Sequence, residues 1–279
     1  MFKMTELPNL KEIYKDNYTF FLTERAKKTD IFFENPLNFI ETLTKKNLTN
    51  VIYKSDRSII YRVSQNPFSE EINNKEPIII KQMIPNTKEI VKQGRQQEAQ
   101  GLLRRRIANN IYSSRIYSEL GINTDAQNFI CGLVDSSIAF LAYKQFGEGI
   151  FFDDYLANMG RFSKDIPIEK VLDCIAKSAL KLHGKRGEKG ALHNDLNTGN
   201  IFLSTENKTN SLKNSGLEIS IIDWELCDYN KGKYVIEDSK RYQELFTLAG
   251  ENRNLYSAAR LKKEDFLILK KIYSNYLNK

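Results

Sequence analysis

Short apolar runs, alternating or continuous, recur through the first half of the chain. Runs of this length that are bounded by Asn, Asp, Ser and Pro are typical of β-strands. The runs at 51–53 and 58–63 are separated by Lys54-Ser-Asp-Arg57, which predicts a β-hairpin. Further strands are predicted at 77–83, 128–134 and 137–143.

Helical spacing of apolar residues becomes the dominant pattern in the second half. A strand-rich first part followed by a helix-rich second part predicts an α+β fold, in one large domain or in two lobes. In the two-lobe interpretation the first lobe spans 49–145 and the second 146–279, and residues 1–48 form an extension packed on the first lobe. The predicted helices are 87–108, 152–158, 168–183 and 262–277.

A polar stretch between two apolar flanks is the most informative part of the sequence. It reads Ala191-Leu-His-Asn-Asp-Leu-Asn-Thr-Gly-Asn200-Ile-Phe-Leu and places His193, Asp195 and Asn200 at the spacing H-x-D-x-x-x-x-N. A second stretch, Ser220-Ile-Ile-Asp-Trp-Glu225, ends a short apolar run with acids. Each stretch alone is also typical of a polar turn, so only the combination indicates a reactive site.

The residue types at these positions suit phosphoryl transfer from ATP. That reaction needs an acceptor hydroxyl held in line and magnesium to neutralise the phosphate charge. Asp195 would orient the hydroxyl, and His193 would brace the loop rather than transfer protons. Asn200 and Asp223 offer the oxygen ligands that magnesium prefers. Glu225 is a further candidate ligand, because it would share a face with Asp223 if the chain stayed extended.

These motifs resemble the catalytic loop and the metal-binding strand of kinase-type phosphotransferases. The order of predicted elements over 50–279 resembles the bilobal protein-kinase-like fold, with a strand-rich N-lobe and a helical C-lobe. In that superfamily a strand lysine holds the ATP phosphates and pairs with a helix glutamate. The resemblance implies these roles for Lys81, in Ile-Ile-Ile-Lys, and for Glu98, with Glu89 as the competing partner.

The resemblance also implies a nucleotide site in the first lobe. Its phosphate-covering loop contains no glycine here, and Asp-Trp-Glu stands where protein kinases have Asp-Phe-Gly. Both departures argue against an ordinary regulated protein kinase. The implied nucleotide-binding residues are Ser55 and Ser58 on the covering loop and Lys144, Gln145 and Phe146 at the hinge that meets adenine.

Within the superfamily, the strings resemble most the lipopolysaccharide core kinases, the 3-deoxy-manno-octulosonic acid (Kdo) kinase group. Residues 239–248 are similar to the R-x-x-D/E-L-x-x-L helix of that group, and residues 261–277 to its closing helix. The resemblance implies a kinase that uses ATP and Mg²⁺ and acts on an anionic glycolipid or sugar. The alternatives are a kinase of the aminoglycoside or choline type, a protein kinase or effector, and a pseudokinase scaffold without enzymatic activity.

The composition indicates what kind of partner the protein attracts and where in the cell we expect it. The 279 residues are 41% hydrophobic, which is typical of globular proteins, and a net charge of +7 attracts anionic partners. Three scattered cysteines predict buried thiols in a reducing cytoplasm. No apolar run reaches the ~20 residues of a membrane span. We therefore expect a cytoplasmic protein, with no nucleic-acid partner, whose Arg104-Arg105-Arg106 either contacts the inner face of a membrane or forms a solvated helix face.

Overall fold

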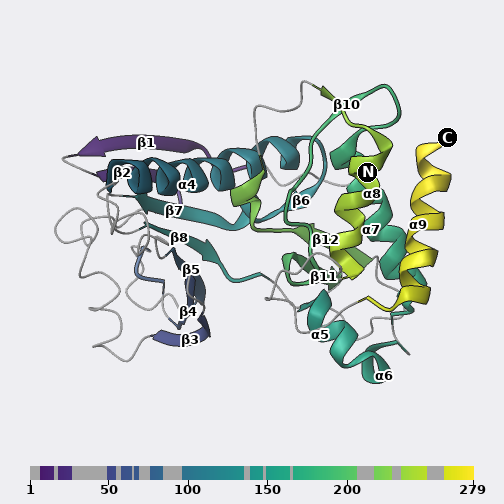
Figure 1. Cartoon of the computed structure of the whole chain (residues 1–279). Coiled ribbons are helices and arrows are strands. Elements are labelled where there is room, and N and C mark those ends of the chain that lie inside the picture. Colours follow the sequence, from purple (N-terminus) through teal and green to yellow (C-terminus); the bar gives the residue numbers. More distant parts are fainter. Residues whose placement is uncertain are drawn as a thin grey trace. The chain divides into compact units, whose positions relative to one another are not determined.

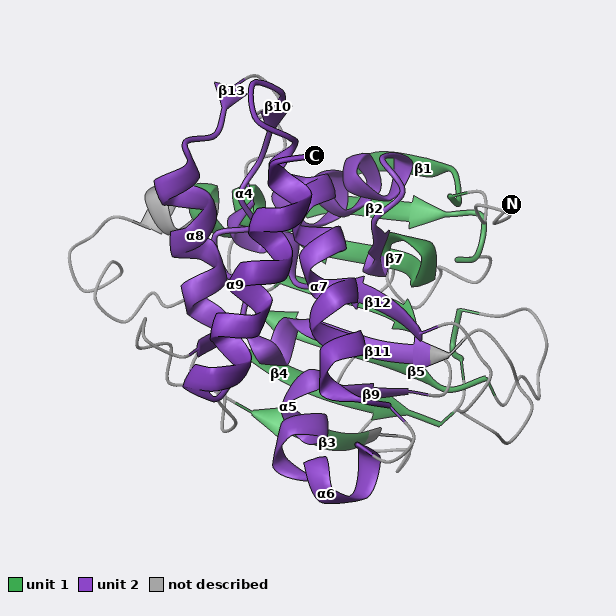
Figure 2. Ribbon diagram, turned by 90° about the vertical axis from the view of Figure 1, so that its right-hand side faces the viewer, with its two compact units in different colours: residues 1–108, 126–146 green, residues 109–125, 147–279 purple. Residues whose placement is uncertain are grey.

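The computed structural model groups the chain into two compact units. One contains residues 1–108 and 126–146, and the other contains residues 109–125 and 147–279 (Figure 2). None of the helices in the described parts of the chain has the length and apolar character that crossing a membrane requires. The structure describes residues 7–15, 18–26, 49–54, 58–64, 66–68, 76–83, 96–134, 139–146, 149–163, 166–205, 217–227, 234–249 and 261–279.

The first unit is built on a seven-stranded antiparallel sheet of order β1-β2-β7-β8-β5-β4-β3 (Figure 1). The predicted hairpin is β3 with β4, and the three other predicted strands are β5, β7 and β8, so these predictions are confirmed. The strands are β1 (Leu10–Lys15), β2 (Tyr18–Thr23), β3 (Thr49–Lys54), β4 (Ser58–Val63), β5 (Ile78–Met83), β7 (Phe129–Val134) and β8 (Ala139–Lys144).

Side chains of β5 alternate between the two faces of the sheet, and this alternation sets the position of Lys81. Ile78 and Ile80 are fully buried in an apolar core that also contains Phe20 and Phe140. Successive side chains of a strand point to opposite faces of the sheet. Lys81 therefore lies on the opposite face from the two buried isoleucines, and it is half-buried.

Helix α4 (Gln96–Glu119) is longer than the sequence pattern indicated. Residues 84–95, at the start of the predicted helix, lie outside the described residues. The predicted end at residue 108 is wrong, because the helix continues through a run of Asn and Ser, which are weak helix formers. Burial explains the continuation, since Asn110, Ser113 and Ser118 are all buried, and tertiary packing outweighs local propensity.

The second unit is mainly helical and also contains a four-stranded sheet of order β6-β12-β11-β9 and the two-stranded ribbon β10-β13. The predicted helices at 152–158, 168–183 and 262–277 are confirmed as α5, α7 and α9. The helices are α5 (Phe152–Ala157), α6 (Met159–Phe162), α7 (Ile168–His183), α8 (Asp238–Phe246) and α9 (Lys263–Leu277), with 3₁₀ turns η2 (Thr198–Asn200), η3 (Trp224–Leu226) and η5 (Thr247–Ala249). A further 3₁₀ turn, η1 (Asp125–Asn128), begins in this unit and continues into the segment 126–146 of the first unit. The strands are β6 (Asn123–Thr124), β9 (Gly149–Phe151), β10 (Lys189–Gly190), β11 (Ile201–Thr205), β12 (Leu217–Ile221) and β13 (Tyr234–Val235).

The pairing of β11 with β12 brings together the two stretches that carry the sequence motifs. The strands are antiparallel, and Ile201 lies opposite Ile221. The backbone N–H of Ile222 donates to the carbonyl oxygen of Asn200 at 3.0 Å, which extends the pairing by one residue. The end of the catalytic-loop motif and the residue before Asp223 are therefore held side by side.

Packing between α7 and α9 forms the centre of the second core (Figure 1). The apolar residues of α7 recur at helical spacing, which places them on one face. Leu172 and Ile175 on α7 and Leu269 on α9 are buried in the same cluster. Trp224 is fully buried there too and stacks on Tyr117 of α4, with ring centroids 5.0 Å apart.

Replacing Gly190 and Gly101 by alanine is expected to change the stability of the protein in opposite directions. A Cβ on Gly190 would lie 1.9 Å from the carbonyl oxygen of His183, so Gly190→Ala must displace backbone and is expected to destabilise the protein by about 3 kcal/mol. Gly101 lies within α4 with nothing inside 4 Å of its added Cβ, so Gly101→Ala is expected to stabilise by about 0.8 kcal/mol. Urea unfolding of both variants checks this pair. A Gly190→Ala protein as stable as wild type would contradict the close approach of β10 to the end of α7.

Candidate active site

The loop at 191–200 holds the carboxylate of Asp195 by both of its oxygens. The side-chain amide of Asn197 donates to Oδ1 at 3.1 Å, and that of Asn200 donates to Oδ2 at 3.2 Å. Asn197 also caps the turn η2, because its Oδ1 accepts the N–H of Gly199 at 2.9 Å. The loop is short and polar, and its own amides satisfy the acid, so Asp195 is fixed before any substrate is present.

Asn200 is buried and has one side-chain atom left for a ligand. Its Nδ2 atom donates to the backbone oxygen of Asp195 at 2.8 Å as well as to the carboxylate. These bonds use the amide nitrogen and leave the carbonyl oxygen of Asn200 outside them. A neutral carbonyl oxygen of this kind is a suitable magnesium ligand.

Asp223 follows β12 with a left-handed backbone, φ 65° and ψ 58°. Burial, and next the negative charge of Asp223, raise the pKa of the Asp195 carboxyl above its ordinary value. A charge acts in this way on a neighbouring carboxyl only over a short range, so the two acids belong to one site. Magnesium usually takes one or two protein carboxylates and leaves its other positions to water and phosphate oxygens, so Asp223 and Asn200 fit it.

The extended-chain argument for Glu225 is wrong. The left-handed conformation of Asp223 turns the chain, and Trp224–Leu226 form the 3₁₀ turn η3 instead of continuing the strand. The alternation that would have put Glu225 on the same face as Asp223 therefore ends at Ile222. The backbone oxygen of Glu225 accepts the side-chain amide of Asn109 at 3.4 Å. Within the described residues, no group of three or more His, Cys, Asp or Glu is arranged to hold a metal.

His193 is completely buried and joins the loop to Ile222, the residue directly before Asp223. Its Nε2–H donates to the backbone oxygen of Ile222 at 3.0 Å, and its ring meets the ring of Trp224 edge to face at 4.7 Å. The Nδ1 atom has no hydrogen-bond partner among the described residues. This geometry supports the interpretation that His193 braces the loop.

Helix α8 supplies a second support that the sequence did not explain. Oε1 of the buried Glu244 accepts the backbone N–H of Asn194 at 2.6 Å, and Asn194 has a left-handed φ of 65°. The hydroxyl of Thr247 donates to the backbone oxygen of Leu196. The sequence did indicate a helix here, because residues 239–248 resemble the R-x-x-D/E-L-x-x-L helix of the Kdo kinase group. That pattern did not indicate which backbone groups the helix would bind.

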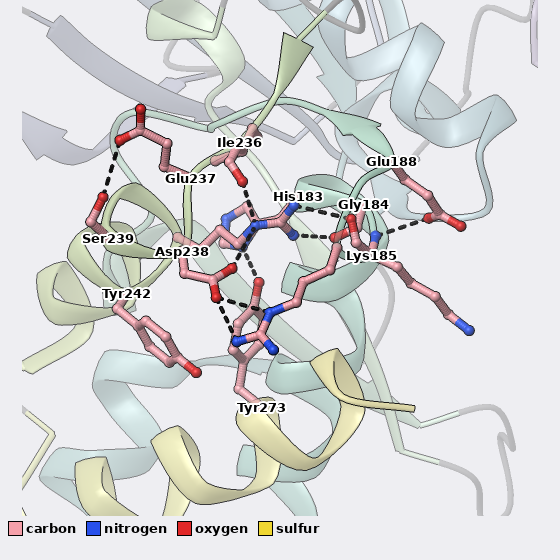
Figure 3. A network of polar contacts seen from close by, with 12 residues as sticks. His183, Gly184, Lys185, Glu188, Ile236, Glu237, Asp238, Ser239, Tyr242 and Tyr273 are labelled. Atoms are coloured by element: carbon pink, nitrogen blue, oxygen red, sulfur yellow. Dashed lines mark hydrogen bonds and ion pairs between the residues drawn. The ribbon is translucent and has the colours of Figure 1, made fainter.

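Arg241, one turn before Glu244 on α8, is also completely buried. Its guanidinium donates to the carbonyl oxygens of Ile236 at 2.9 Å and Lys185 at 3.1 Å, and also to that of Gly184. Figure 3 shows Gly184, Lys185 and Ile236 gathered around these bonds. Arg241 thereby connects α8 to the turn that follows α7 and to Ile236, the residue directly after β13.

The candidate lysine for the phosphates lies in the first unit. Lys81 pairs across the sheet with Ile60 of β4 and Leu141 of β8, at the centre of a regular antiparallel region. Glu98 lies in α4, but its side chain is outside the described residues. Glu89 and Ser55 are also outside them, and Ser58 is the half-buried first residue of β4.

The candidate hinge follows β8 in the same unit. Lys144 forms an ion pair with Glu76 at 3.0 Å. The backbone N–H of Gln145 donates to the carbonyl oxygen of Pro77 at 3.1 Å, so this N–H is already used inside the sheet. Phe146 follows as a half-buried residue. An adenine contact at this segment would therefore use backbone groups other than the N–H of Gln145.

The raised pKa of Asp195 predicts a pH-dependent stability. A carboxyl whose pKa is raised in the folded state favours folding below the unfolded value near 3.8, and this contribution is lost as the pH rises through the raised pKa. Asp195→Asn removes the titration. The unfolding free energy of the variant minus that of wild type is therefore expected to increase from pH 3.8 upward. Urea unfolding at a series of pH values measures it, and a constant difference would contradict the environment described for Asp195.

Comparison with known proteins supports the fold. No protein-family model matches the sequence, and no curated protein matches it. The structure of the Rio2 kinase–ADP/Mg²⁺–phosphoaspartate complex from Chaetomium thermophilum is similar over 97% of this chain and 72% of its own, with a TM-score of 0.51 and 12% identity. WaaP in complex with acyl carrier protein matches 90% of this chain and 88% of its own, with a TM-score of 0.46 and 13% identity. With its antiparallel N-terminal sheet and helical C-terminal part, the chain has a protein-kinase-like fold.

Proposed function

We propose that this protein is an ATP-dependent kinase that transfers the γ-phosphoryl group to a hydroxyl. The observation that carries the proposal is the carboxylate of Asp195, which two side-chain amides hold on a loop whose last residue, Asn200, is hydrogen-bonded to the residue before Asp223. Phosphoryl transfer requires mainly positioning and charge stabilisation, and a fixed carboxylate beside oxygen ligands supplies both.

Each residue then has a distinct role. Asp195 accepts a hydrogen bond from the acceptor hydroxyl and orients its oxygen toward the phosphorus. The carbonyl oxygen of Asn200 and the carboxylate of Asp223 would hold Mg²⁺, which when bound neutralises the phosphate charge. Lys81, paired with Glu98, would hold the phosphates of ATP.

The nucleotide and its acceptor need further contacts. We propose that the covering loop around Ser55 and Ser58 and the hinge at 144–146 surround the nucleotide. For the acceptor we propose an anionic glycolipid or sugar of the Kdo type. Its support is the motif resemblance and the net charge of +7, together with the exposed Arg104 and Arg105 on α4, which can attract anionic head groups.

An acceptor screen tests this proposal. The protein is incubated with γ-labelled ATP and Mg²⁺ and, separately, with Kdo-lipid A, an aminoglycoside, choline or a generic protein. Label in the glycolipid is the expected result. Label in an aminoglycoside or in choline would move the protein to the small-molecule kinases, and label in protein alone would overturn the glycolipid acceptor. Absence of any Mg²⁺-dependent ATP turnover would favour a pseudokinase scaffold.

A further inference from the structure

Three buried side chains connect the last helix of the chain to the catalytic loop. Nδ1 of His183, at the end of α7, lies 2.7 Å from the hydroxyl of Tyr273 on α9. Nε2 of the same ring lies 2.6 Å from Oε2 of Glu244 on α8. His183 and Tyr273 are fully buried, and Glu244 is 5% exposed. Figure 3 shows the contact between His183 and Tyr273.

The chemistry of the three groups sets the direction of these hydrogen bonds. An ionised carboxylate only accepts, so Nε2 of His183 carries the proton that it shares with Glu244. In the neutral ring Nδ1 is then an acceptor, and the hydroxyl of Tyr273 donates to it. Burial raises the pKa of Tyr273 to about 12, so the hydroxyl keeps its proton near neutral pH. With Glu244 ionised and the ring of His183 neutral, the bonds run in one direction, from Tyr273 through His183 to Glu244.

Glu244 connects these two hydrogen bonds to the loop that contains Asp195. Its other oxygen, Oε1, accepts the N–H of Asn194, the residue directly before Asp195. Rotation about the last bond of a glutamate side chain is soft, so a carboxylate fixed through one oxygen can still turn. His183 fixes the second oxygen, and Tyr273 fixes the ring of His183. A non-glycine residue in the left-handed conformation of Asn194 is less stable than in the ordinary regions, so the surrounding structure must hold it there.

We propose that Tyr273 and His183 are positioning residues of the catalytic loop, which act through Glu244 on the backbone at Asn194. The kinetic part of this inference rests on the proposed kinase function. The structural part does not, because it concerns only how firmly the Asn194 N–H is held. A small change in the placement of a reacting group can cost a large part of a rate, so a remote hydroxyl can matter for catalysis.

Tyr273→Phe tests the inference, since it removes the hydroxyl and keeps the ring in the core. We expect hydrogen exchange at the backbone N–H of Asn194, followed by NMR, to become roughly tenfold faster. The reason is that one of the hydrogen bonds linking Tyr273, His183 and Glu244 is lost. We expect kcat to fall roughly tenfold, with the KM for ATP unchanged, because the loss acts on orientation rather than nucleotide binding.

Tyr276→Phe is the matched control on the same helix. The hydroxyl of Tyr276 donates to Oδ1 of Asp173 at 2.5 Å, so it also links α9 to α7, but this bond does not reach the loop. We expect Tyr276→Phe to leave both kcat and exchange at Asn194 as in wild type. Amides of α5 serve as an internal reference, because a general loss of stability would accelerate their exchange as well.

A second variant, His183→Phe, shows whether the three groups act as one chain. Residues of one network give non-additive effects, so the double variant with Tyr273→Phe is expected to be no worse than His183→Phe alone. Unchanged exchange at Asn194 in Tyr273→Phe, or an equal change in Tyr276→Phe, would overturn the inference. If exchange responds as expected but wild type shows no phosphoryl transfer, the positioning role stands and the proposed kinase function fails.

Discussion

Replacing Asp195 by alanine is expected to lower the rate of phosphoryl transfer by roughly 10³-fold, the usual size of a lost general base or orienting acid. The carboxylate is held by Asn197 and Asn200 and has no substitute among their amides, which donate rather than accept. The KM for ATP is expected to change little, since the lost interaction is made with the acceptor hydroxyl. Steady-state assays with labelled ATP and the acceptor identified by the screen measure both quantities.

Asp173→Ala is a suitable control for that result. Asp173 is a half-buried acid of the same unit, paired with Lys177 at 2.7 Å on α7, and it takes no part in the loop. Its variant is expected to transfer phosphate at close to the wild-type rate. If wild type and Asp195→Ala instead share the same residual ATP turnover, the residue has no catalytic role and the pseudokinase alternative gains support.

The largest loss of stability is expected from Arg241→Met. The guanidinium is fully buried and donates to three backbone carbonyl oxygens, two of them in the turn after α7. Methionine fills much of the same volume but leaves these carbonyls without their donor, and each buried unsatisfied group costs about 1–3 kcal/mol. We expect the free energy of unfolding in urea to fall by about 3–5 kcal/mol, comparable to breaking a buried ion pair.

Arg186→Met provides the comparison, because both arginines form an ion pair with Asp238, at 2.6 Å for Arg186 and 3.7 Å for Arg241. Arg186 donates to Oδ2 of Asp238 at 2.6 Å, but its side chain is 58% exposed. Exposed pairs contribute little, so this variant is expected to unfold at nearly the same urea concentration as wild type. Equal losses in the two variants would mean that burial of Arg241 does not set its contribution.

The elements and motifs that were predictable are those set by local pattern. The hairpin of β3 and β4 is visible in two apolar runs around a polar turn, and α7 was placed at its observed bounds by helical spacing. The H-x-D-x-x-x-x-N string and Asp223 were readable because the phosphoryl transfer proposed for them requires particular residue types at short spacing. Lys81 was placed on its strand by three preceding isoleucines.

Other features depend on contacts between distant parts of the chain, which a pattern does not contain. The left-handed turn at Asp223 ends the alternation on which the argument for Glu225 relied. The helix α4 continues to Glu119 because its serines and asparagines are buried, against their propensity. Glu244 reaches a loop 50 residues earlier in the chain, so its role became visible only in the folded structure.

The left-handed backbone of Asp223 also determines which substitutions can be interpreted at this position. Aspartate and asparagine tolerate positive φ better than alanine does. An alanine scan would therefore combine a conformational penalty with the loss of the carboxylate that we propose as a magnesium ligand, and would exaggerate the apparent contribution of that carboxylate. Asparagine, which has the same shape without the charge, separates the two effects and is the informative replacement at this position.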